Sequence, residues 1–311
     1  MTQIITHPAL RPEGFQPLLM GKAAHDRRLV NALLDGWEAQ GFAQVAPINV
    51  DFSDTLFPDH SQQAHTRTFR FMDSSSESML ALLPDVTLGI ARLAKGELAQ
   101  TPRPLRLAYE GQAIRAKGSA TQPARQFGQV GIEIIGVENG KSTSFEMISL
   151  AIKSLQDLGL SKLSLTLVDP PLAALLIKDE LPMLSQKEQT DLAQALDRKD
   201  EGKIKTLAGE QASYLLSLMR GQQKTEPILQ TLMQLKNSLF TTFKETEIQI
   251  SIEPFEQRGF VFQSGPSFAI YSPKIEGELG RGGTYELEGE RCFGFTLYRN
   301  TLLSALENTR I

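Results

Sequence analysis

The spacing of apolar residues changes repeatedly along the chain, and each change predicts a new element. In DRRLVNALLDGWEAQ apolar residues recur three and four positions apart, and Gly41 follows, so residues 24–40 are predicted to form an amphipathic helix. The next segment, FAQVAPINV (42–50), favours a strand. The first predicted elements are therefore a helix and a strand.

Strand and helix patterns continue to alternate over the first half of the chain. Residues 68–98 favour a strand, a serine-rich turn, a short strand and a helix that begins near Asp85. The next predicted elements are two neighbouring strands at 104–116 and 125–136, a helix at 142–160 and a strand at 162–169. This order predicts a mixed sheet covered by helices.

The pattern changes after residue 170. Residues 185–243 are rich in Gln, Lys, Glu and Leu and lack β-branched runs, which predicts two or three helices. The elements predicted after this segment are strands at 246–254, 259–273 and 292–298, with the glycine-rich stretch 277–289 between the last two, and a final helix at 301–308. We expect a core domain over 1–170 and 244–311, and a helical insertion subdomain over 171–243.

Composition narrows the class of protein. The chain has 311 residues, 41% hydrophobic and 22% charged, with a net charge of −4, which is typical of a globular protein and not of a nucleic-acid binder. Cys292 is the only cysteine, and the four histidines show no metal-ligand spacing (His7, His25, His60, His65). We therefore expect no metal, and we expect no cofactor. Because no targeting or spanning segment is recognisable, we also expect no membrane span and a cytoplasmic location.

One strand carries polar residues that call for an explanation. Gln129 and Glu133 lie on the same face of the predicted strand, and Gly131 leaves room between them. Their neighbours on the strand are strongly apolar, which favours side chains that line a cavity over side chains that face water. An ion pair of Glu133 with Arg115 or Arg258 is the structural alternative, and tight backbone geometry is the expected role of the glycines.

Five motifs in this order resemble the catalytic core of histidyl-tRNA synthetase, a class II aminoacyl-tRNA synthetase. They are FRFMD with SMLALLPDVT, LAYEGQAIRA with RQFGQVGIEIIG, RGFVFQSGPSFAIY, GRGGTYEL, and GFTLYRNTLL. The resemblance covers about Gly14 to Leu303. It implies an α+β fold: an antiparallel sheet flanked by helices, with a helical insertion before the last strands.

The resemblance implies that the half of the site that binds the amino acid is largely kept. The family's LRPEGT motif appears as LLPDVT, with Asp85 at the carboxylate that receives the α-ammonium group of histidine. The residues that the resemblance assigns to histidine binding are Asp85, Thr87, Arg115, Gln129, Glu133, Arg258, Phe262 and Gln263. The family's RGLDYY reads RGFVFQ here, so an aspartate and two tyrosines that frame the histidine side chain are replaced.

The same resemblance implies that the nucleotide half is lost. In the motif F-R-x-E the carboxylate is replaced by Lys117, and the arginine of the last motif is replaced by Thr301. Arg299 and Asn300 cannot replace that arginine in the same geometry. Activation of an amino acid with ATP is therefore not expected. Because no counterpart of the family's anticodon-binding domain is recognised, recognition of tRNA is not expected either.

A synthetase-like core with these losses resembles the regulatory subunits of ATP phosphoribosyltransferase. The resemblance implies a non-catalytic chain that forms a homodimer within a hetero-octamer with the short catalytic subunit, and that senses histidine in the first step of histidine biosynthesis. A proline such as Pro47 belongs to the motif through which class II cores dimerise. Two alternatives stay open: a structural activator that no longer binds histidine, and a stand-alone synthetase-like ligase.

Overall fold

The computed structural model describes residues 10–57, 68–119, 122–137, 140–221, 227–257 and 263–308. The chain forms two compact units, Met1–Glu133 with Thr296–Ile311, and Ile134–Phe295. Strands β6 (Gln126–Ile135) and β11 (Glu290–Tyr298) each contribute residues to both units. Within the described residues, no helix is both long and apolar enough to cross a membrane.

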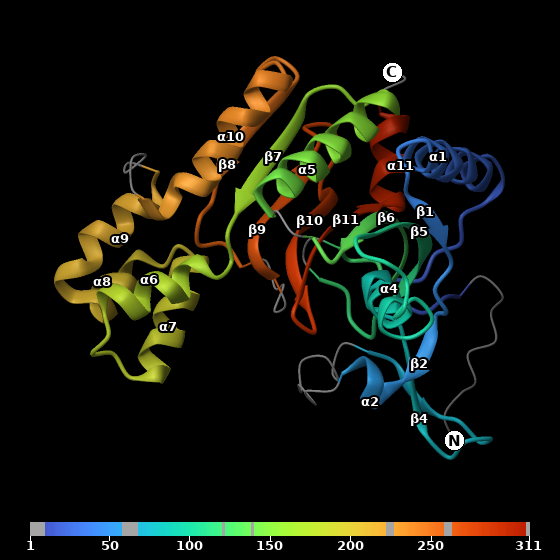
Figure 1. The fold of residues 1–311 in the computed structure, drawn as a ribbon, viewed down its shortest axis with the longest axis horizontal. Coiled ribbons are helices and arrows are strands. Elements are labelled where there is room, and N and C mark those ends of the chain that lie inside the picture. The colour runs from blue at the N-terminus through green and yellow to red at the C-terminus, as the bar shows by residue number, and fades with distance from the viewer. Residues whose placement is uncertain are drawn as a thin grey trace. The chain divides into compact units, whose positions relative to one another are not determined.

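The described part of the first unit contains four helices and the strands that carry the predicted amino-acid site (Figure 1). Besides its parts of β6 and β11, its described elements are α1 Met20–Glu38, β1 Ala43–Val45, β2 Val50–Phe52, α2 Ser53–Leu56, β3 Arg70–Met72, β4 Met79–Leu82, α4 Val86–Lys95, β5 Leu105–Ile114 and α11 Arg299–Glu307. Strand β1 pairs with β5 in parallel, and β5 is the neighbour of β6. Helix α1 packs against β5 and α11, and it buries Trp37, which is 1% exposed.

The segment predicted as one strand over 42–50 is two short strands, so that prediction is wrong. Strand β1 pairs with β5, whereas β2 belongs to a separate antiparallel sheet with the order β2-β4-β3. The break falls at Pro47, which has no backbone N–H to donate to a sheet. Pro47 instead packs against helix α4, where a side chain at Gly89 would lie 2.8 Å from its Cβ atom.

The described part of the second unit contains strands in the order β11-β10-β9-β7-β8, together with the last two residues of β6, and helices around them. Besides its part of β11, its elements are α5 Gly140–Asp157, β7 Leu163–Val168, α6 Leu172–Glu180, α7 Gln186–Asp197, α8 Glu201–Ala208, η1 Gly209–Gln211, α9 Ala212–Met219, η2 Pro227–Leu229, α10 Gln230–Thr242, β8 Ile248–Ile252, β9 Gln263–Tyr271 and β10 Glu278–Leu287. Strands β9 and β10 are antiparallel, whereas β7 and β8 are parallel. Helix α5 packs against β10, and α10 packs against α5, β7 and β8.

Strand β10 was not predicted, because its sequence reads as a glycine-rich connection between two strands. The glycines are needed inside the strand for space. A Cβ atom at Gly282 would overlap the backbone oxygen of Gly294, and one at Gly283 would overlap the side chain of Ser267. Glycine in a strand interior often marks such a close approach of backbone and neighbour. Because glycine has a low strand propensity, the sequence pattern did not predict β10, which is an inner strand of this unit.

The helical segment of the second unit has its own apolar cluster. Helices α6 to α9 pack around buried residues such as Ile177, Leu196 and Leu215, and Phe255 joins them from beyond strand β8. In Figure 1 these helices form the yellow group below α10. The described part of 185–243 contains four α-helices, α7 to α10, so the predicted two or three is too few. Leucine spacing does not show where one helix ends, and the break after α8 falls at Gly209, whose φ is 54°. The division into core and insertion stays a prediction.

Asp169 lies between β7 and α6, and partial burial raises the pKa of its carboxyl to about 6 from the ordinary value of 3.8. Because the folded protein favours the protonated form, the associated stability is full below about pH 4 and is lost as the pH rises through about 6. We expect Asp169→Asn to be more stable than the parent chain by about 1–3 kcal/mol at pH 8 and equally stable near pH 4.

Urea denaturation at both pH values measures this difference. Asp157→Asn is a suitable control, because Asp157 is exposed at the end of α5. An equal stability of parent and Asp169→Asn at pH 8 would show that burial of Asp169 carries no such cost.

Candidate functional site

Asp85 lies at the start of helix α4 and caps it. Its backbone is extended, and its Oδ1 atom accepts a hydrogen bond from the backbone N–H of Thr87 at 3.2 Å. Aspartate is among the preferred residues at this position because its carboxylate satisfies an otherwise unpaired N–H group. The start of this helix near Asp85 is as the sequence predicts. The residue expected to meet a ligand ammonium group therefore also fixes the first turn of α4.

Gln129 and Glu133 reach the same helix turn from strand β6. Gln129 Oε1 accepts from the backbone N–H of Val86 at 2.8 Å, and Glu133 Oε1 accepts from Thr87 Oγ1 at 2.9 Å. The side chains are deeply buried, with Gln129 0% and Glu133 2% exposed. Strand alternation thus directs the two polar residues to one place, as their spacing of four positions predicts.

Arg115 pairs with Asp85 at the more exposed side of this group. Its guanidinium donates to the carbonyl of Pro84 at 2.9 Å and to Asp85 Oδ2 at 3.4 Å, and it lies 4.8 Å from the centre of the Phe127 ring. Asp85 Oδ2 also accepts from Gln129 Nε2 at 3.3 Å. The side chains of Asp85 and Arg115 are 22% and 23% exposed. The carboxylate of Asp85 and the guanidinium of Arg115 therefore pair with each other, and both side chains are partly accessible to water.

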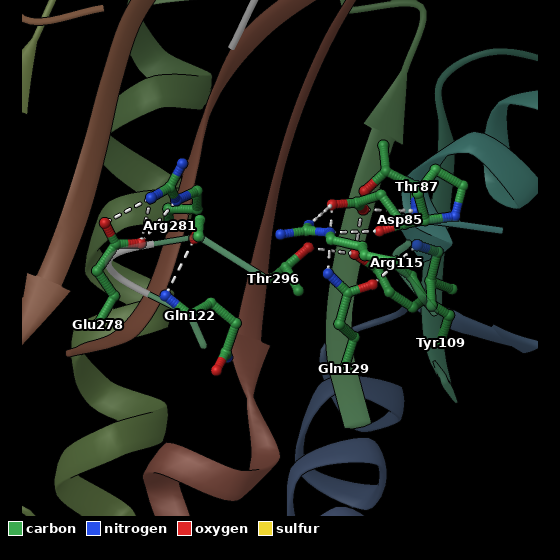
Figure 2. Close-up of polar contacts among 12 residues, drawn as sticks. Asp85, Thr87, Tyr109, Arg115, Gln122, Gln129, Glu278, Arg281 and Thr296 are labelled. Carbon is green, nitrogen blue, oxygen red and sulfur yellow. Dashed lines mark hydrogen bonds and ion pairs between the residues drawn. The ribbon is translucent and has the colours of Figure 1, made fainter. Parts of the chain in front are cut away.

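Tyr109 and Thr296 complete this group, and the sequence analysis did not find them. The Tyr109 hydroxyl lies 2.7 Å from Thr296 Oγ1 and 3.3 Å from Thr87 Oγ1 (Figure 2). Burial, followed by the nearby carboxylates of Glu133 and Asp85, raises the pKa of Tyr109 well above its ordinary value. The one sequence signal for Tyr109 is its place on a predicted strand next to that of Gln129. We call Asp85, Thr87, Tyr109, Arg115, Gln129, Glu133 and Thr296 the polar cluster.

The structure thus brings together five of the eight predicted site residues, all in the first unit. Gln263 is partly buried at the start of β9, where it lies opposite Tyr285 in the second unit. Arg258 and Phe262 lie outside the described residues. Arg115 forms an ion pair with Asp85, and the alternative pair of Glu133 with Arg258 stays open because Arg258 is not among the described residues.

Lys117 and Thr301 stand at the positions to which the resemblance assigns the family's nucleotide-binding residues. Lys117 is exposed, and Thr301 is half-buried in α11. Arg299 pairs through Nε with Asp26 Oδ1 at 2.9 Å and through Nη1 with Glu110 Oε2 at 2.6 Å. Burial lowers the pKa of Arg299, but hydrogen bonds and charge from Asp26 and Glu110 outweigh it and raise the pKa overall. Its guanidinium is therefore committed to structural partners.

A second charged group lies in the other unit, on strand β10. Arg281 Nε donates to Glu278 Oε2 at 2.7 Å (Figure 2). The Tyr271 hydroxyl donates to Glu278 Oε1 at 3.4 Å. The side chains of Arg281 and Glu278 are 13% and 1% exposed. A shift in the pairing of β9 and β10 lies between Glu278 and Gly280. The two opposite charges satisfy each other, so we interpret them as a structural pair that supports this irregularity.

Among the described residues, His, Cys, Asp and Glu side chains do not gather in threes around a point that could hold a metal ion. The polar cluster combines carboxylates, a guanidinium, an amide and hydroxyls at hydrogen-bonding distances, which are groups that can bind a polar ligand.

Comparison with known proteins defines the class of fold. The family model described as histidyl-tRNA synthetase matches residues 14–302. A Bacillus halodurans structure named as an ATP phosphoribosyltransferase regulatory subunit/histidyl-tRNA synthetase is 21% identical, with a TM-score of 0.80 over 96% of this chain and 84% of that one. Histidyl-tRNA synthetase from Nostoc sp. PCC 7120 is 14% identical, with a TM-score of 0.73 over 97% and 76%. The fold is that of a class II synthetase core, which confirms the predicted fold class.

Curated relatives narrow the class further. Proteins from Rhodospirillum centenum and Rhodospirillum rubrum are each 34% identical to this chain. The matches cover 96% of this chain and 81% and 82% of the two relatives, respectively. A protein from Gluconobacter oxydans is 32% identical over 96% of this chain and 81% of its own. All three are named ATP phosphoribosyltransferase regulatory subunit. The chain belongs to the family of ATP phosphoribosyltransferase regulatory subunits, a branch of the histidyl-tRNA synthetase family.

Proposed function

We propose that this chain is the non-catalytic regulatory subunit of an ATP phosphoribosyltransferase, and that a separate short chain transfers the phosphoribosyl group. The observation that carries the proposal is the similarity to three regulatory subunits over 96% of the chain. The regulatory chain is proposed to form a homodimer within a hetero-octamer, and to be needed for the activity of the short chain and for its inhibition by histidine. The transfer of the phosphoribosyl group is proposed to be the first step of histidine biosynthesis.

The polar cluster is the proposed histidine site. Asp85 and Arg115 carry opposite charges, 3.4 Å apart, and each is partly exposed. A free amino acid supplies an ammonium group for Asp85 and a carboxylate for Arg115, so it can replace their mutual pairing with two charge-assisted pairs. Thr87, Gln129 and Glu133 are proposed to contact the remaining polar groups of the ligand. Arg258, Phe262 and Gln263 keep their assignment on the basis of the resemblance.

Regulation then follows from linked equilibria. Histidine that binds one state of the assembly more tightly than another shifts the population toward that state, and the shift is limited by the difference in affinity. The absence of amino-acid activation is proposed on the basis of Lys117 and Thr301, which replace a carboxylate and an arginine of the synthetase motifs. The commitment of Arg299 to Asp26 and Glu110 supports this proposal.

Calorimetric titration of the purified chain with histidine tests the ligand. We expect binding in the parent chain, and affinities about 10- to 100-fold weaker in Asp85→Asn and Arg115→Met, because each removes a hydrogen-bonded charge. Asparagine can still cap α4, so the helix is preserved in the first variant. Arg92→Met is the matched control, because Arg92 also lies in the first unit and pairs with Asp51 at 3.2 Å, outside the polar cluster.

Two further measurements separate the alternatives. Co-purification and assay with a short ATP phosphoribosyltransferase chain should give a stable complex that is more active than the short chain alone. Histidine-dependent exchange of pyrophosphate into ATP should stay at background, and exchange above background would favour the ligase alternative. A complex that activates the short chain while histidine gives no heat would leave the role of structural activator.

A further inference from the structure

Three hydroxyl groups in the polar cluster form a chain that ends on a carboxylate. Thr296 Oγ1 lies 2.7 Å from the Tyr109 hydroxyl, which lies 3.3 Å from Thr87 Oγ1. Thr87 Oγ1 in turn donates to Glu133 Oε1 at 2.9 Å. The hydroxyl chain connects the end of β11, strand β5, the first turn of α4 and strand β6 within the first unit. Figure 2 labels Thr296, Tyr109 and Thr87.

The number of hydrogens gives this chain a direction. Each hydroxyl has one hydrogen to donate, and an ionised carboxylate accepts only. Thr87 uses its hydrogen on Glu133, so the contact between Thr87 and Tyr109 requires the Tyr109 hydroxyl to donate. Tyr109 must then accept from Thr296. The order of donation is therefore Thr296 to Tyr109 to Thr87 to Glu133.

Burial makes the hydrogen bonds of the hydroxyl chain hard to replace by hydrogen bonds to water. Tyr109 is 0% exposed, Glu133 is 2% exposed and Thr296 is 7% exposed. A hydroxyl that loses its partner at such a position cannot turn to bulk water instead, so the whole cost of the lost hydrogen bond is felt. The Tyr109 hydroxyl is protonated at neutral pH even at its ordinary pKa, and burial raises that pKa further, so the hydroxyl can donate.

We propose that Thr296, acting through Tyr109, is a positioning residue for ligand binding in the polar cluster. The inference rests on the proposed function and extends it. By donating to Tyr109, Thr296 orients the Tyr109 hydrogen toward Thr87, and Thr87 in turn holds Oε1 of Glu133. The carboxylate of Glu133 is thereby presented in one orientation as an acceptor, which suits a ligand that brings N–H donors, such as an ammonium group or an imidazole.

The test compares variants of Thr296 in the full chain. Thr296→Val removes the first donor while keeping the branched shape, and Thr296→Ser restores the hydroxyl. Thr284→Val is the matched control, because Thr284 is also 7% exposed and its hydroxyl donates to the carbonyl of Pro266 in the second unit, at 3.2 Å. Two quantities are measured: the affinity for histidine by calorimetry, and the NMR signal of the Tyr109 ring carbon that bears the hydroxyl, assigned with Tyr109→Phe.

We expect Thr296→Val to bind histidine about 3- to 10-fold more weakly than the parent chain. The NMR signal of Tyr109 should shift in Thr296→Val. The affinity of Thr296→Ser and of Thr284→Val for histidine should stay within about 2-fold of the parent value. Unchanged affinity in Thr296→Val would overturn the proposal, and so would an equal loss in Thr284→Val. Should the parent chain bind no histidine, the proposed histidine site fails. A Tyr109 signal that moves in Thr296→Val alone would then still support the hydroxyl chain, whereas an unmoved signal would refute it.

Discussion

Replacing Arg299 with methionine is expected to lower the free energy of unfolding of the first unit by about 3–5 kcal/mol. The variant leaves Asp26 without the guanidinium that pairs with it, and Asp26 is only 5% exposed. A buried carboxylate without a partner is costly, so the loss exceeds the value of the ion pair itself. Urea denaturation followed by fluorescence of Trp37 measures the effect, because this single tryptophan is buried in α1.

Two further variants identify the cause of that loss. Lys22→Met is the matched control, because Lys22 and Glu307 join the same two helices, α1 and α11, by an ion pair of 3.1 Å whose side chains are 61% and 41% exposed. It should cost less than about 1 kcal/mol. The double variant Asp26→Leu with Arg299→Met should recover much of the stability, since neither charge is then buried alone. A double variant as unstable as Arg299→Met would contradict this explanation.

Replacing Gly282 with alanine is expected to destabilise the second unit by about 3 kcal/mol or more. A Cβ atom at this position would overlap the carbonyl oxygen of Gly294 and would lie 2.5 Å from the Cβ atom of Phe295. The first of these neighbours is backbone of the adjacent strand β11, which cannot move aside without breaking the pairing of β10. Scanning calorimetry should show a melting temperature lower by about 6 °C or more.

Gly265→Ala is the matched control for this prediction. Gly265 also lies in a strand of the second unit, but a Cβ atom there would be 3.4 Å from the Cβ atom of Thr284, which is close to ordinary contact. It should change stability by less than about 1 kcal/mol. If both alanine variants melt at the temperature of the parent chain, space is not the reason for glycine at position 282.

Local patterns predicted most of the elements, and the exceptions share a cause. The helix at Met20–Glu38 and the paired strands β5 and β6 follow directly from periodicity. Strand β10 was missed because the need for glycine there comes from neighbouring strands, which are distant in sequence. The division of residues 42–50 between two sheets depends on Pro47 and on what each half pairs with.

The candidate site was predicted as far as strand alternation and the family motifs reach. Asp85, Gln129 and Glu133 lie together because a helix start and one face of a strand meet, and both features are visible in the sequence. Tyr109 and Thr296 were not found, because their roles depend on hydrogen bonds between residues 187 positions apart. The pairing of Arg115 with Asp85 likewise requires two segments 30 positions apart to come together.

The sequence by itself determined the family, the order of most elements and the chemical types available to the site, because these depend on local spacing and on motifs. The tertiary structure decided how those groups satisfy one another. It commits Arg299 to Asp26 and Glu110, pairs Arg115 with Asp85, and orders the hydroxyl chain that ends on Glu133. The physical reason is that buried polar groups must find partners, and the partners available are set by which distant segments the fold brings within hydrogen-bonding distance.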